Sequence, residues 1–480
     1  MSKTPVYITT TLPYVNAEPH VGFAMELVRA DIINRFKKLM GHEVFFNTGT
    51  DEHGIKIYKR AQEEGKDIKD FVDENAAKFK SLIELLHIDK DIHFLRTTDE
   101  SHIRAAQEFW KRCAQGGFIC KGKYSVKYCT GCELEKTDSE LENGHCVLHP
   151  NIPIEFIDEE NYFFKFSAFA TKLLHLYEKP GFVIPEVRLN EIKSFVKQGL
   201  QVFSVSRLKE KMPWGIPVPD APEHVMYVWF DALVSYISTL GWPDEKGDFE
   251  KFWVNGETIQ YAGKDNLRQQ SAMWQAMLMA AGLPNSKHIV INGFITSGGQ
   301  KMSKSLGNVV DPLEVVNVFG AEAFRYFVAR ELSSFEDSDF TMEAFKTAHN
   351  ANLANGLGNL VSRVLTMAKE YGVLDEYNVD KKALAIAGVA TSLNNFGIKE
   401  AIDKIWLSIG EIDKFIQFKK PFLVYKTDPQ TAKVDVKTAL YQLHQIAISL
   451  KPFMPNTSDS ILKLIKEKTT PVTPLFPRME

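Results

Sequence analysis

A glycine-flanked loop reads GGQKMSKSLG at residues 298–307. Its two lysines, three residues apart, predict a mobile clamp for phosphate charge, whereas Lys-x-x-Lys alone is more often a solvated surface turn. The segment HVGF at residues 20–23 favours the clamp. It follows a short apolar strand and opens an amphipathic helix, so its backbone N–H groups and the positive helix end suit a bound phosphate.

These two segments resemble the paired signatures of class I aminoacyl-tRNA synthetases, usually written HIGH and KMSKS. The second is intact here, and the first reads HVGF. The resemblance implies ATP-dependent activation of an amino acid at the α-phosphate, with pyrophosphate leaving. Such a displacement needs charge stabilisation more than covalent help. It also implies that His20 and Gly22 position ATP, and that Lys301 and Lys304 stabilise the departing pyrophosphate in the transition state.

The length, composition and net charge of the chain limit which classes of protein it can belong to. A chain of 480 residues should hold two to four domains, and 44% hydrophobic with 25% charged residues is ordinary for a globular protein. The net charge of −4 excludes a global field that attracts nucleic acid, so any tRNA contact must be local.

The sequence gives no sign of a membrane or secretory protein. The N-terminus MSKTPVYITT enters a strand without the apolar region of a signal peptide, and no run approaches eighteen apolar residues. A cytoplasmic chain is therefore expected. Its five cysteines are then read as metal ligands or thiols before disulfides.

Strands and helices alternate at both ends of the first 294 residues. Strands are expected at 6–9, 44–47, 258–261 and 289–291, and helices at 21–40, 68–87, 100–116, 227–240 and 269–281. Between them, residues 118–225 are rich in Cys, Lys and Tyr with short β-like pieces at 162–166 and 202–206. This pattern predicts an α/β fold: a Rossmann-type nucleotide-binding domain with a parallel sheet, split by an insertion.

The last part of the chain has helical periodicity. From residue 343 onward the apolar residues recur every three to four positions, which predicts an α-helical bundle. With the resemblance, the expected divisions are the first half of the catalytic domain (1–117), a connective insertion with a zinc knuckle (118–225), the second half of the catalytic domain (226–294), the lysine loop with a stem-contact region (295–342), and an anticodon-binding α-helical domain (343–480).

Two pairs of metal-ligating residues lie in the insertion. CTGC at 129–132 and CVLH at 146–149 give Cys-x2-Cys and Cys-x2-His, separated by thirteen residues. The spacing predicts one tetrahedral Zn²⁺ held by Cys129, Cys132, Cys146 and His149, with no position left open for substrate and hence a structural role. His145 is an alternative fourth ligand, and four unrelated ligand-type residues are the alternative to a metal site.

The length of the chain narrows the choice among the class I enzymes. The class I enzymes for valine, leucine and isoleucine carry a large editing insertion that this chain is too short to hold, which leaves chiefly methionyl and cysteinyl enzymes among small members with a zinc insertion. The chain resembles methionyl-tRNA synthetases over nearly its whole length. The matching stretches are residues 11–16, 48–54, 214–219, 227–232, 263–265 and 301–308, together with the four metal ligands.

An aromatic helix face suits a methionine side chain. Trp229, Leu233 and Tyr236 fall at i, i+4 and i+7, a stripe that is more often core packing. Beside Leu12 and Tyr14 it would form an aromatic slot for a flexible thioether. Asp51 follows the second strand and is either a turn residue or a carboxylate for the substrate's α-ammonium group.

The resemblance assigns further residues. For methionine it implies Leu12, Tyr14, Asp51, Trp229, Ala232, Leu233, Tyr236, Gln270 and Trp274. For ATP it implies His20, Gly22, Phe23, Glu26, Gly263, Asp265, Lys301, Met302, Ser303 and Lys304. The chain departs from the family pattern at Phe23, in place of the second histidine of HIGH, and at Gln270, where many relatives have histidine.

One predicted helix in the last part of the chain has a polar face. Asn352, Asn355, Asn359 and Arg363 follow steps of three and four, which simple amphipathicity also explains. Asparagine is a mediocre helix former, however, so three in this register suggest a purpose. The resemblance implies that Asn359 and Arg363 read anticodon bases by direct hydrogen bonds, with Phe422 in place of a stacking tryptophan.

The sequence therefore predicts a methionine–tRNA ligase, with ATP, L-methionine and tRNA(Met) as substrates, Mg²⁺ on the phosphates and one structural Zn²⁺. No membrane contact is expected, and the chain shows no appended C-terminal tRNA-binding domain, which is consistent with a monomer. The alternatives are a cysteinyl enzyme, a tRNA-independent nucleotidylyltransferase, and a non-catalytic tRNA-binding relative that would have no reason to keep the lysine loop.

Overall fold

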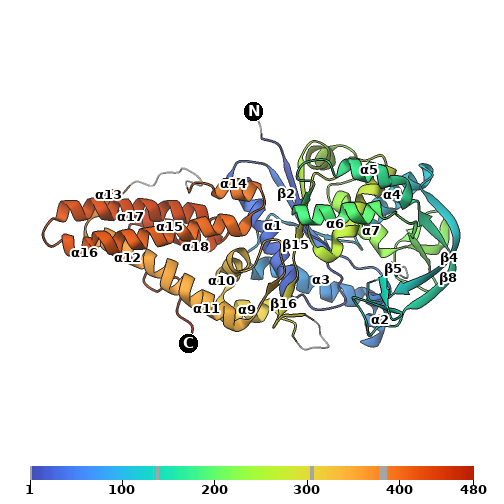
Figure 1. The fold of residues 1–480 in the computed structure, drawn as a ribbon, viewed down its shortest axis with the longest axis horizontal. Coiled ribbons are helices and arrows are strands. Elements are labelled where there is room, and N and C mark those ends of the chain that lie inside the picture. The colour runs from blue at the N-terminus through green and yellow to red at the C-terminus, as the bar shows by residue number, and fades with distance from the viewer. Residues whose placement is uncertain (1–2, 133, 137–139, 303–307, 378–385) are drawn as a thin grey trace.

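The structure, a computed structural model, describes residues 3–132, 134–136, 140–302, 308–377 and 386–480. A six-stranded parallel sheet lies at its centre, in the order β3-β2-β1-β14-β15-β9 (Figure 1). Its strands are β1 (Val6–Thr9), β2 (Val44–Thr50), β3 (His93–Arg96), β9 (Val183–Ile184), β14 (Glu257–Gly263) and β15 (His288–Asn292). The predicted parallel sheet and its four predicted strands are confirmed, whereas β3 and β9 were not expected.

The strand order creates a crevice at the carboxyl ends of two neighbouring strands. β1 pairs with β2 on one side and with β14 on the other, so the chain leaves the sheet in opposite directions beyond β1 and β14. Such a reversal is where open α/β sheets bind ligands. The segments that follow β1 and β14 carry His20 and Asp265, respectively.

Helices cover both faces of the sheet and divide the core in two. One hydrophobic cluster joins α1 (Val21–Leu39), α2 (Ile55–Glu63) and α3 (Ile68–Leu85) to the helical part of the chain. The other joins α4 (Glu100–Gln115), α7 (Val228–Ser238) and α8 (Trp274–Ala280) to the insertion. The sheet therefore separates two apolar layers, each shared with a different neighbouring region.

The described part of the insertion contains three small antiparallel sheets. One has the order β10-β8-β4-β5, a second has the order β11-β13-β12, and the third pairs β6 (Leu141–Glu142) with β7 (His145–Cys146). The bounds are β4 (Ile119–Cys129), β5 (Leu134–Lys136), β8 (Glu155–Phe164), β10 (Phe203–Ser204), β11 (Ser206–Leu208), β12 (Pro217–Val218) and β13 (Ala221–Met226), with helices α5 (Ala170–Leu176) and α6 (Glu186–Lys197) between β8 and β10.

The predicted division treated residues 118–225 as a region apart from the central sheet. In the structure this insertion contributes one strand to that sheet. Its short strand β9 pairs in parallel with β15 and forms the edge of that sheet. β9 is only two residues long, too short to show an alternation of apolar and polar residues. The sequence pattern therefore had no signal for it.

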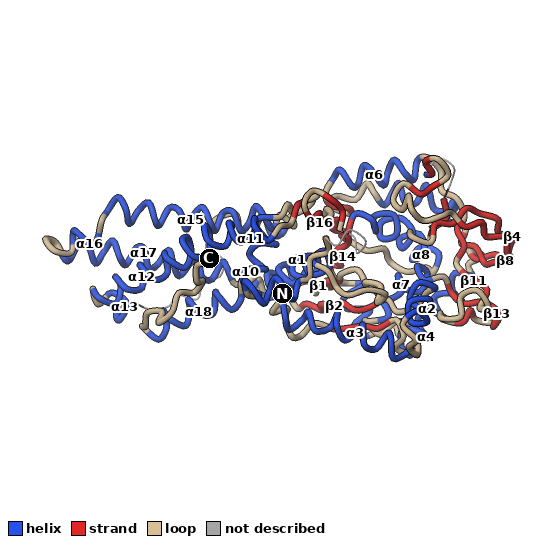
Figure 2. Tube along the Cα trace, turned by 90° about the horizontal axis from the view of Figure 1, so that it is seen from below, coloured by secondary structure: helices blue, strands red, loops and turns tan. Residues whose placement is uncertain are grey.

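The C-terminal part is helical, as predicted. A small sheet of β16 (Ile295–Ser297), β17 (Gln300–Lys301) and β18 (Ser338–Asp339) lies among its first helices, because helices separate β17 from β18 in the sequence. The helices are α9 (Pro312–Phe319), α10 (Ala321–Tyr326), α11 (Met342–Ala348), α12 (Asn359–Glu370), α13 (Val373–Glu376), α14 (Val389–Asn394), α15 (Ile398–Lys419), α16 (Pro421–Val424), α17 (Pro429–Leu450) and α18 (Pro455–Glu467). Figures 1 and 2 place α16 at the end of the molecule opposite to β4 and β8.

The expected polar face of four side chains is not one continuous α-helical line. Residues His349–Gly358 form the π-helical segment η8, and only from Asn359 does α12 continue as an α-helix. A π-helix closes i→i+5 hydrogen bonds, so positions three and four apart no longer stack on one line. Asn352 and Asn355 thus follow a different periodicity from Asn359 and Arg363.

A buried arginine joins the helical part to the α/β domain. Arg325 forms an ion pair with Asp31 at 2.7 Å, and both side chains are fully buried. It also donates to the backbone carbonyls of Phe453 and Leu86. Because a buried charge is costly unless paired and hydrogen-bonded, this junction specifies how the two regions meet. No helix of the described ranges is both long and apolar enough to cross a membrane.

Candidate active site, metal cluster and distal helical surface

One cavity of about 600 Å³ lies at the crevice between β1 and β14. It brings together most of the positions predicted for ATP and methionine. The predicted residues on its wall are Leu12, Tyr14, His20, Gly22, Phe23, Glu26, Asp51, Trp229, Ala232, Leu233, Tyr236, Gly263, Asp265, Gln270 and Met302. Trp274 is not among them, because it is fully buried behind Tyr236, with ring centroids 6.0 Å apart.

His20 is the N-cap of α1. Its Nδ1 accepts a hydrogen bond from the backbone N–H of Gly22 at 3.1 Å. A neutral imidazole whose Nδ1 accepts carries its proton on Nε2, which leaves an N–H donor for a ligand. The protein atoms around its ring partly desolvate it and lower the pKa of His20, although the residue keeps solvent-exposed surface, and the nearby Asp265 carboxylate partly opposes that shift. The imidazole is therefore held as a neutral donor at the start of a helix.

Gly22 has a steric reason to be glycine. A Cβ built at this position would lie 2.9 Å from Cε1 of His20, closer than normal contacts allow. Phe23, next in the chain, packs edge-on against Phe79 of α3 with ring centroids 5.5 Å apart. The first signature segment thus keeps the His20 ring over the helix start and anchors its next residue on α3.

Glu26 is a buried carboxyl at the floor of the cavity. The backbone N–H and the hydroxyl of Thr11 both donate to its Oε1, at 2.7 and 2.6 Å. Burial raises the pKa of Glu26 to about 7, although the two Thr11 hydrogen bonds oppose the shift. Its charge therefore changes close to neutral pH.

The predicted aromatic slot forms on the wall of this cavity. Trp229, Leu233 and Tyr236 of α7 all line it, and Tyr14 meets Trp229 edge-on with ring centroids 6.2 Å apart. The spacing i, i+4, i+7 therefore marks a helix face that borders a cavity as well as the core. An elongated apolar group would contact rings from two different elements there.

A chain of side-chain amides lies behind Tyr236. The amide of Gln270 donates to the Tyr236 hydroxyl at 2.5 Å, and the amide of Gln260 donates to Gln270 Oε1 at 3.4 Å. The hydroxyl of Ser286 in turn donates to Gln260. Gln270 is 2% exposed, so these bonds fix which way its amide points. Sequence reasoning did not identify Gln260 or Ser286.

Asp51 lies at the carboxyl end of β2 and is also 2% exposed. Its backbone N–H donates to the Pro13 carbonyl at 3.0 Å, and Val15 donates back to the Asp51 carbonyl at 3.3 Å. The loop that carries Leu12 and Tyr14 is thereby fixed against the residue proposed to meet the substrate's ammonium group.

The two residues after Asp51 are held by buried charges. Arg96 binds Glu52 through two bonds of 2.7 and 2.8 Å. His53 Nδ1 lies 3.2 Å from an Asp231 carboxylate oxygen on α7. Burial raises the pKa of Asp231, and the His53 imidazole partly opposes this. The end of β2 is therefore connected to α7, which carries the aromatic slot.

The four predicted metal ligands come together. Cys129, Cys132, Cys146 and His149 offer ligand atoms that all lie within 4.8 Å of one another. Cys132 Sγ lies 3.4 Å from Cys146 Sγ and 3.2 Å from His149 Nδ1. A tetrahedral Zn²⁺ spaces two sulfurs by about 3.8 Å and a sulfur and a nitrogen by about 3.5 Å, so this donor set fits the ion. His145, the alternative ligand, is exposed and is not part of the cluster.

The metal cluster borders the same cavity. Gly131, Cys132, Leu148 and His149 contribute to its wall, and the Lys56 ammonium donates to the Gly131 carbonyl at 2.8 Å. Sequence reasoning missed Lys56, although it lies just after the stretch 48–54. Asn292, also on the wall, ends β15, and the carboxyl-end rule alone would have found it.

The lysine loop is only partly described. Gln300–Lys301 forms β17, and Met302 lies on the cavity wall. Ser303 and Lys304, assigned to ATP from the sequence, lie outside the described residues. The chain resumes at Asn308, and the Val310 carbonyl accepts a hydrogen bond from the Val21 N–H at 3.1 Å.

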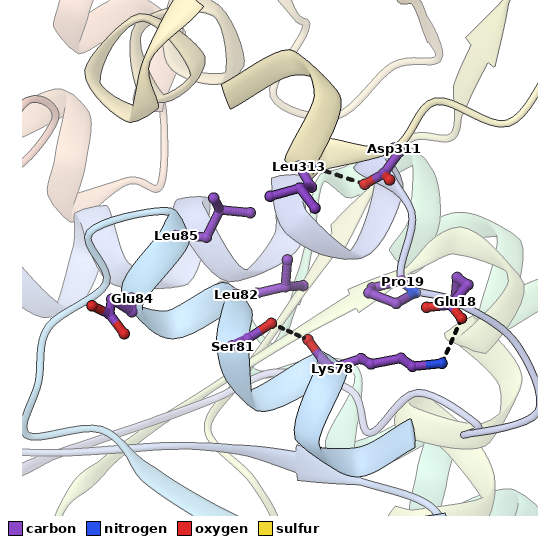
Figure 3. A pocket seen from close by; sticks show the side chains of 9 residues that line it. All are labelled: Glu18, Pro19, Lys78, Ser81, Leu82, Glu84, Leu85, Asp311 and Leu313. Atoms are coloured by element: carbon purple, nitrogen blue, oxygen red, sulfur yellow. Dashed lines mark hydrogen bonds and ion pairs between the residues drawn. The ribbon is translucent and has the colours of Figure 1, made fainter. Parts of the chain in front are cut away.

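A second cavity, of about 460 Å³, lies beside the segment that leads into His20 (Figure 3). Lys78 of α3 reaches Glu18 at 2.6 Å, and Asp311 accepts from the Leu313 N–H at the start of α9. It contains none of the residues assigned to ATP or methionine from the sequence. Both ends of the Lys78–Glu18 pair are well exposed, so the pair is worth at most about 1 kcal/mol.

The positions predicted for anticodon reading lie in the helical part, on α12 and α16. Asn359 is exposed at the start of α12, and Arg363, one turn later, forms an ion pair with Asp413 of α15 at 2.6 Å. Phe422 on α16 is 47% exposed. The helices that carry these positions lie away from the central sheet (Figure 1).

Comparison with known proteins agrees with this layout. The family model described as tRNA synthetases class I (M) matches residues 6–146 and 129–365, and the model for the anticodon binding domain of methionyl tRNA ligase matches residues 369–474.

Proteins that are similar to this chain over most of its length include methionine–tRNA ligases. A methionine–tRNA ligase of Rhizobium meliloti is 39% identical, covering 97% of this chain and 92% of that protein. One of Clostridium perfringens is 40% identical, covering 98% and 74%. The solved Mycobacterium tuberculosis methionyl-tRNA synthetase in complex with methionyl-adenylate superposes with a TM-score of 0.90 at 34% identity, covering 99% of this chain and 100% of that one.

Proposed function

We propose, on the premise that this chain belongs to the methionyl-tRNA synthetase family of class I enzymes, that it activates L-methionine with ATP and transfers the methionyl group to tRNA(Met). The observation that carries the proposal is the single cavity in which a helix-start histidine, a strand-end carboxylate and an aromatic slot meet. Neither a nucleotidylyltransferase nor a tRNA-binding relative would need all three together with the distal helical surface.

The proposed chemistry is an in-line attack by the methionine carboxylate on the α-phosphorus of ATP. The attacking oxygen forms a mixed anhydride, the bond to the bridging oxygen breaks, and pyrophosphate leaves with its electron pair. The Nε2–H of His20 and the N-terminal end of α1 favour the phosphate charge. Lys301 and Lys304 would stabilise the departing pyrophosphate, and Mg²⁺ with ATP would neutralise it further.

Methionine would lie with its ammonium group toward Asp51 and its thioether among Tyr14, Trp229 and Tyr236. The carboxylate of Asp51 has a stable position because its backbone is bonded to the loop of residues 11–15. The sulfur would face rings whose contact with thioethers is favourable. The Tyr236 hydroxyl, oriented by Gln270, is the nearest polar group that this account assigns to the sulfur end.

One structural Zn²⁺ would be held by Cys129, Cys132, Cys146 and His149. The ion would keep the knuckle folded at the cavity wall, and all four of its positions would be taken by protein. The donor to the Gly131 carbonyl, Lys56, connects the knuckle to α2. A cytoplasmic location belongs to the same proposal, because ATP, methionine and tRNA meet there.

The test is charging of tRNA. Purified protein, ATP, labelled methionine and a tRNA(Met) transcript should give methionyl-tRNA whose ester bond is hydrolysed by mild base. A transcript lacking its 3′-terminal adenosine is the matched control and should accept nothing. Charging with cysteine in place of methionine would favour the cysteinyl alternative, and no charging with any amino acid would refute the proposal.

A further inference from the structure

The tip of the helical part carries an exposed aromatic side chain with no assigned role. Phe418, in the last turn of α15, is 82% exposed, and no other aromatic side chain in the described part of the chain is as exposed. Phe422 and Leu423 of α16 are also exposed nearby in the sequence. We call Phe418, Phe422, Leu423 and the lysines at 414, 419, 420 and 426 the tip surface.

Packing does not explain Phe418. The buried residues of α15 are isoleucines, one alanine and Trp406, and they include Ile405, Ile409, Ile412 and Ile416 at steps of three and four. Phe418 follows Ile416 by two positions, which places it on the outward side of the helix. A phenyl ring that is this exposed contributes little to folding, so packing within the chain does not account for it.

The charge around Phe418 indicates what kind of partner. Residues 414–427 contain four lysines and no Asp or Glu, and one of these lysines, Lys419, lies 4.0 Å from the carboxylate of Asp435 on α17. The acidic residue just before this run, Asp413, is occupied by Arg363 and by the Gln417 amide at 2.7 Å. The acidic residue just after it, Asp428, caps α17 by accepting from the Thr431 N–H. A cationic surface with exposed rings is typical of single-stranded nucleic acid binding.

The backbone of the tip is well defined. Lys420 adopts the left-handed conformation with φ 47°, which ends α15, and Pro421 starts α16. Tyr425 then stacks on Tyr371 at the end of α12, with ring centroids 3.8 Å apart and planes within 5°. The segment with Phe422 is therefore fixed to the helix that carries Asn359 and Arg363. Little ordering entropy remains to be lost on binding.

We propose that Phe418 is a second stacking platform, for an unpaired base of the RNA loop that Arg363, Asn359 and Phe422 are expected to contact. The inference rests on the proposed charging of tRNA(Met). Every base has a π-face, so stacking on Phe418 contributes affinity without choosing between bases. Discrimination stays with hydrogen-bonding side chains such as Arg363.

The test measures binding of two RNA hairpins by fluorescence anisotropy, one with the methionine anticodon CAU and one with that triplet changed. Phe418→Ala should raise the Kd for both hairpins by the same factor, on the order of 5- to 100-fold. Phe418→Trp should restore binding. Leu407→Ala is the matched control, because Leu407 is a 64% exposed apolar residue of the same helix, and it should bind both hairpins normally.

Salt dependence separates stacking from charge. Phe418→Ala should leave the slope of log Kd against log salt concentration unchanged, whereas Lys420→Ala should reduce it by about 0.7. A change of less than twofold for Phe418→Ala, a loss confined to the CAU hairpin, or a change in sedimentation instead of RNA binding would each overturn the proposal. Methionine-dependent pyrophosphate exchange should be equal in wild type and Phe418→Ala. Absence of exchange in both proteins would refute the proposed function. Normal RNA binding by Phe418→Ala is a different result, which would refute only the stacking proposal.

Discussion

The backbone N–H of Val21 donates to the carbonyl oxygen of Val310 at 3.1 Å. This bond joins the first turn of α1, just after His20, to the segment that leaves the lysine loop. The first signature is therefore bonded to a segment that lies almost 300 residues away in the sequence, a few residues beyond the second signature. This bond fixes the segment after the lysine loop beside the first turn of α1.

Replacing the proposed ammonium-binding residue should weaken methionine binding selectively. Asp51→Asn keeps the size of a residue that is 2% exposed but removes its charge. We expect methionine affinity to fall by about 2–5 kcal/mol, the range for truncating one partner of a buried charge pair. Isothermal titration with methionine and with its analogue lacking the amino group measures this. The wild type should prefer methionine strongly, and an unchanged preference in the variant would contradict the assignment.

The buried carboxyl at the cavity floor should make stability depend on pH. The folded-state pKa of Glu26, about 7, is above its ordinary value of 4.5. The folded state therefore binds this proton more tightly than the unfolded state. That stability is fully present below about pH 4.5 and is lost as pH rises through 7.

Glu26→Gln tests this directly, because the glutamine oxygen still accepts from Thr11 but never ionises. The variant should match the wild type at pH 4 and exceed it at pH 8 by up to about 3 kcal/mol in free energy of unfolding. Urea denaturation at the two pH values is the measurement. A difference between the two proteins that is the same at both pH values would show that the charge of Glu26 is not responsible.

Metal analysis should distinguish the two histidines near the knuckle. Wild type purified under reducing conditions should contain one zinc per chain, and His149→Ala and Cys129→Ser should lose it because each removes a ligand from a four-ligand site. His145→Ala should retain it. Cys120→Ser is the control for a cysteine outside the cluster. Zinc lost from His145→Ala but kept by His149→Ala would reverse the ligand assignment.

Arg363 should affect tRNA choice without affecting activation. Arg363→Ala should cost about 1–3 kcal/mol of discrimination for the methionine anticodon, because a forked base contact is lost. Arg363→Lys should lose most of the same discrimination, since an ammonium cannot make the paired bonds. Charging of tRNAs with normal and altered anticodons, beside pyrophosphate exchange, measures both effects. Equal losses in the two assays would indicate that the Arg363–Asp413 ion pair only supports the fold.

Much of the architecture was predictable because it follows local periodicity. The strands 6–9 and 258–261 and the helix 21–40 match β1, β14 and α1 within a few residues. The metal cluster was predictable because the spacing of ligands on tight turns is a local feature of the sequence. It does not depend on how the surrounding strands are arranged. Strand β9 was not, because two residues carry no pattern and only its pairing with β15 defines it.

Other features depend on contacts between distant segments. The π-helical segment η8 has leucines four residues apart, at 353 and 357, as an α-helix does, so its different register could not be read from residue spacing. The Gln260–Gln270–Tyr236 chain and the His53–Asp231 pair join residues from separate elements. Trp274 was assigned to the slot through family resemblance, yet it lies one layer behind it, because ring packing against Phe109 and Tyr236 places it in the core.

Exchange of pyrophosphate into ATP, measured with each of the twenty amino acids, shows directly whether methionine is the amino acid that is activated. We expect rapid exchange with L-methionine alone, because only its thioether and α-ammonium group satisfy both the aromatic slot and Asp51. Exchange should need no tRNA, since the distal surface is remote from the cavity. Exchange that ran equally well with cysteine, or that required no amino acid, would contradict the account.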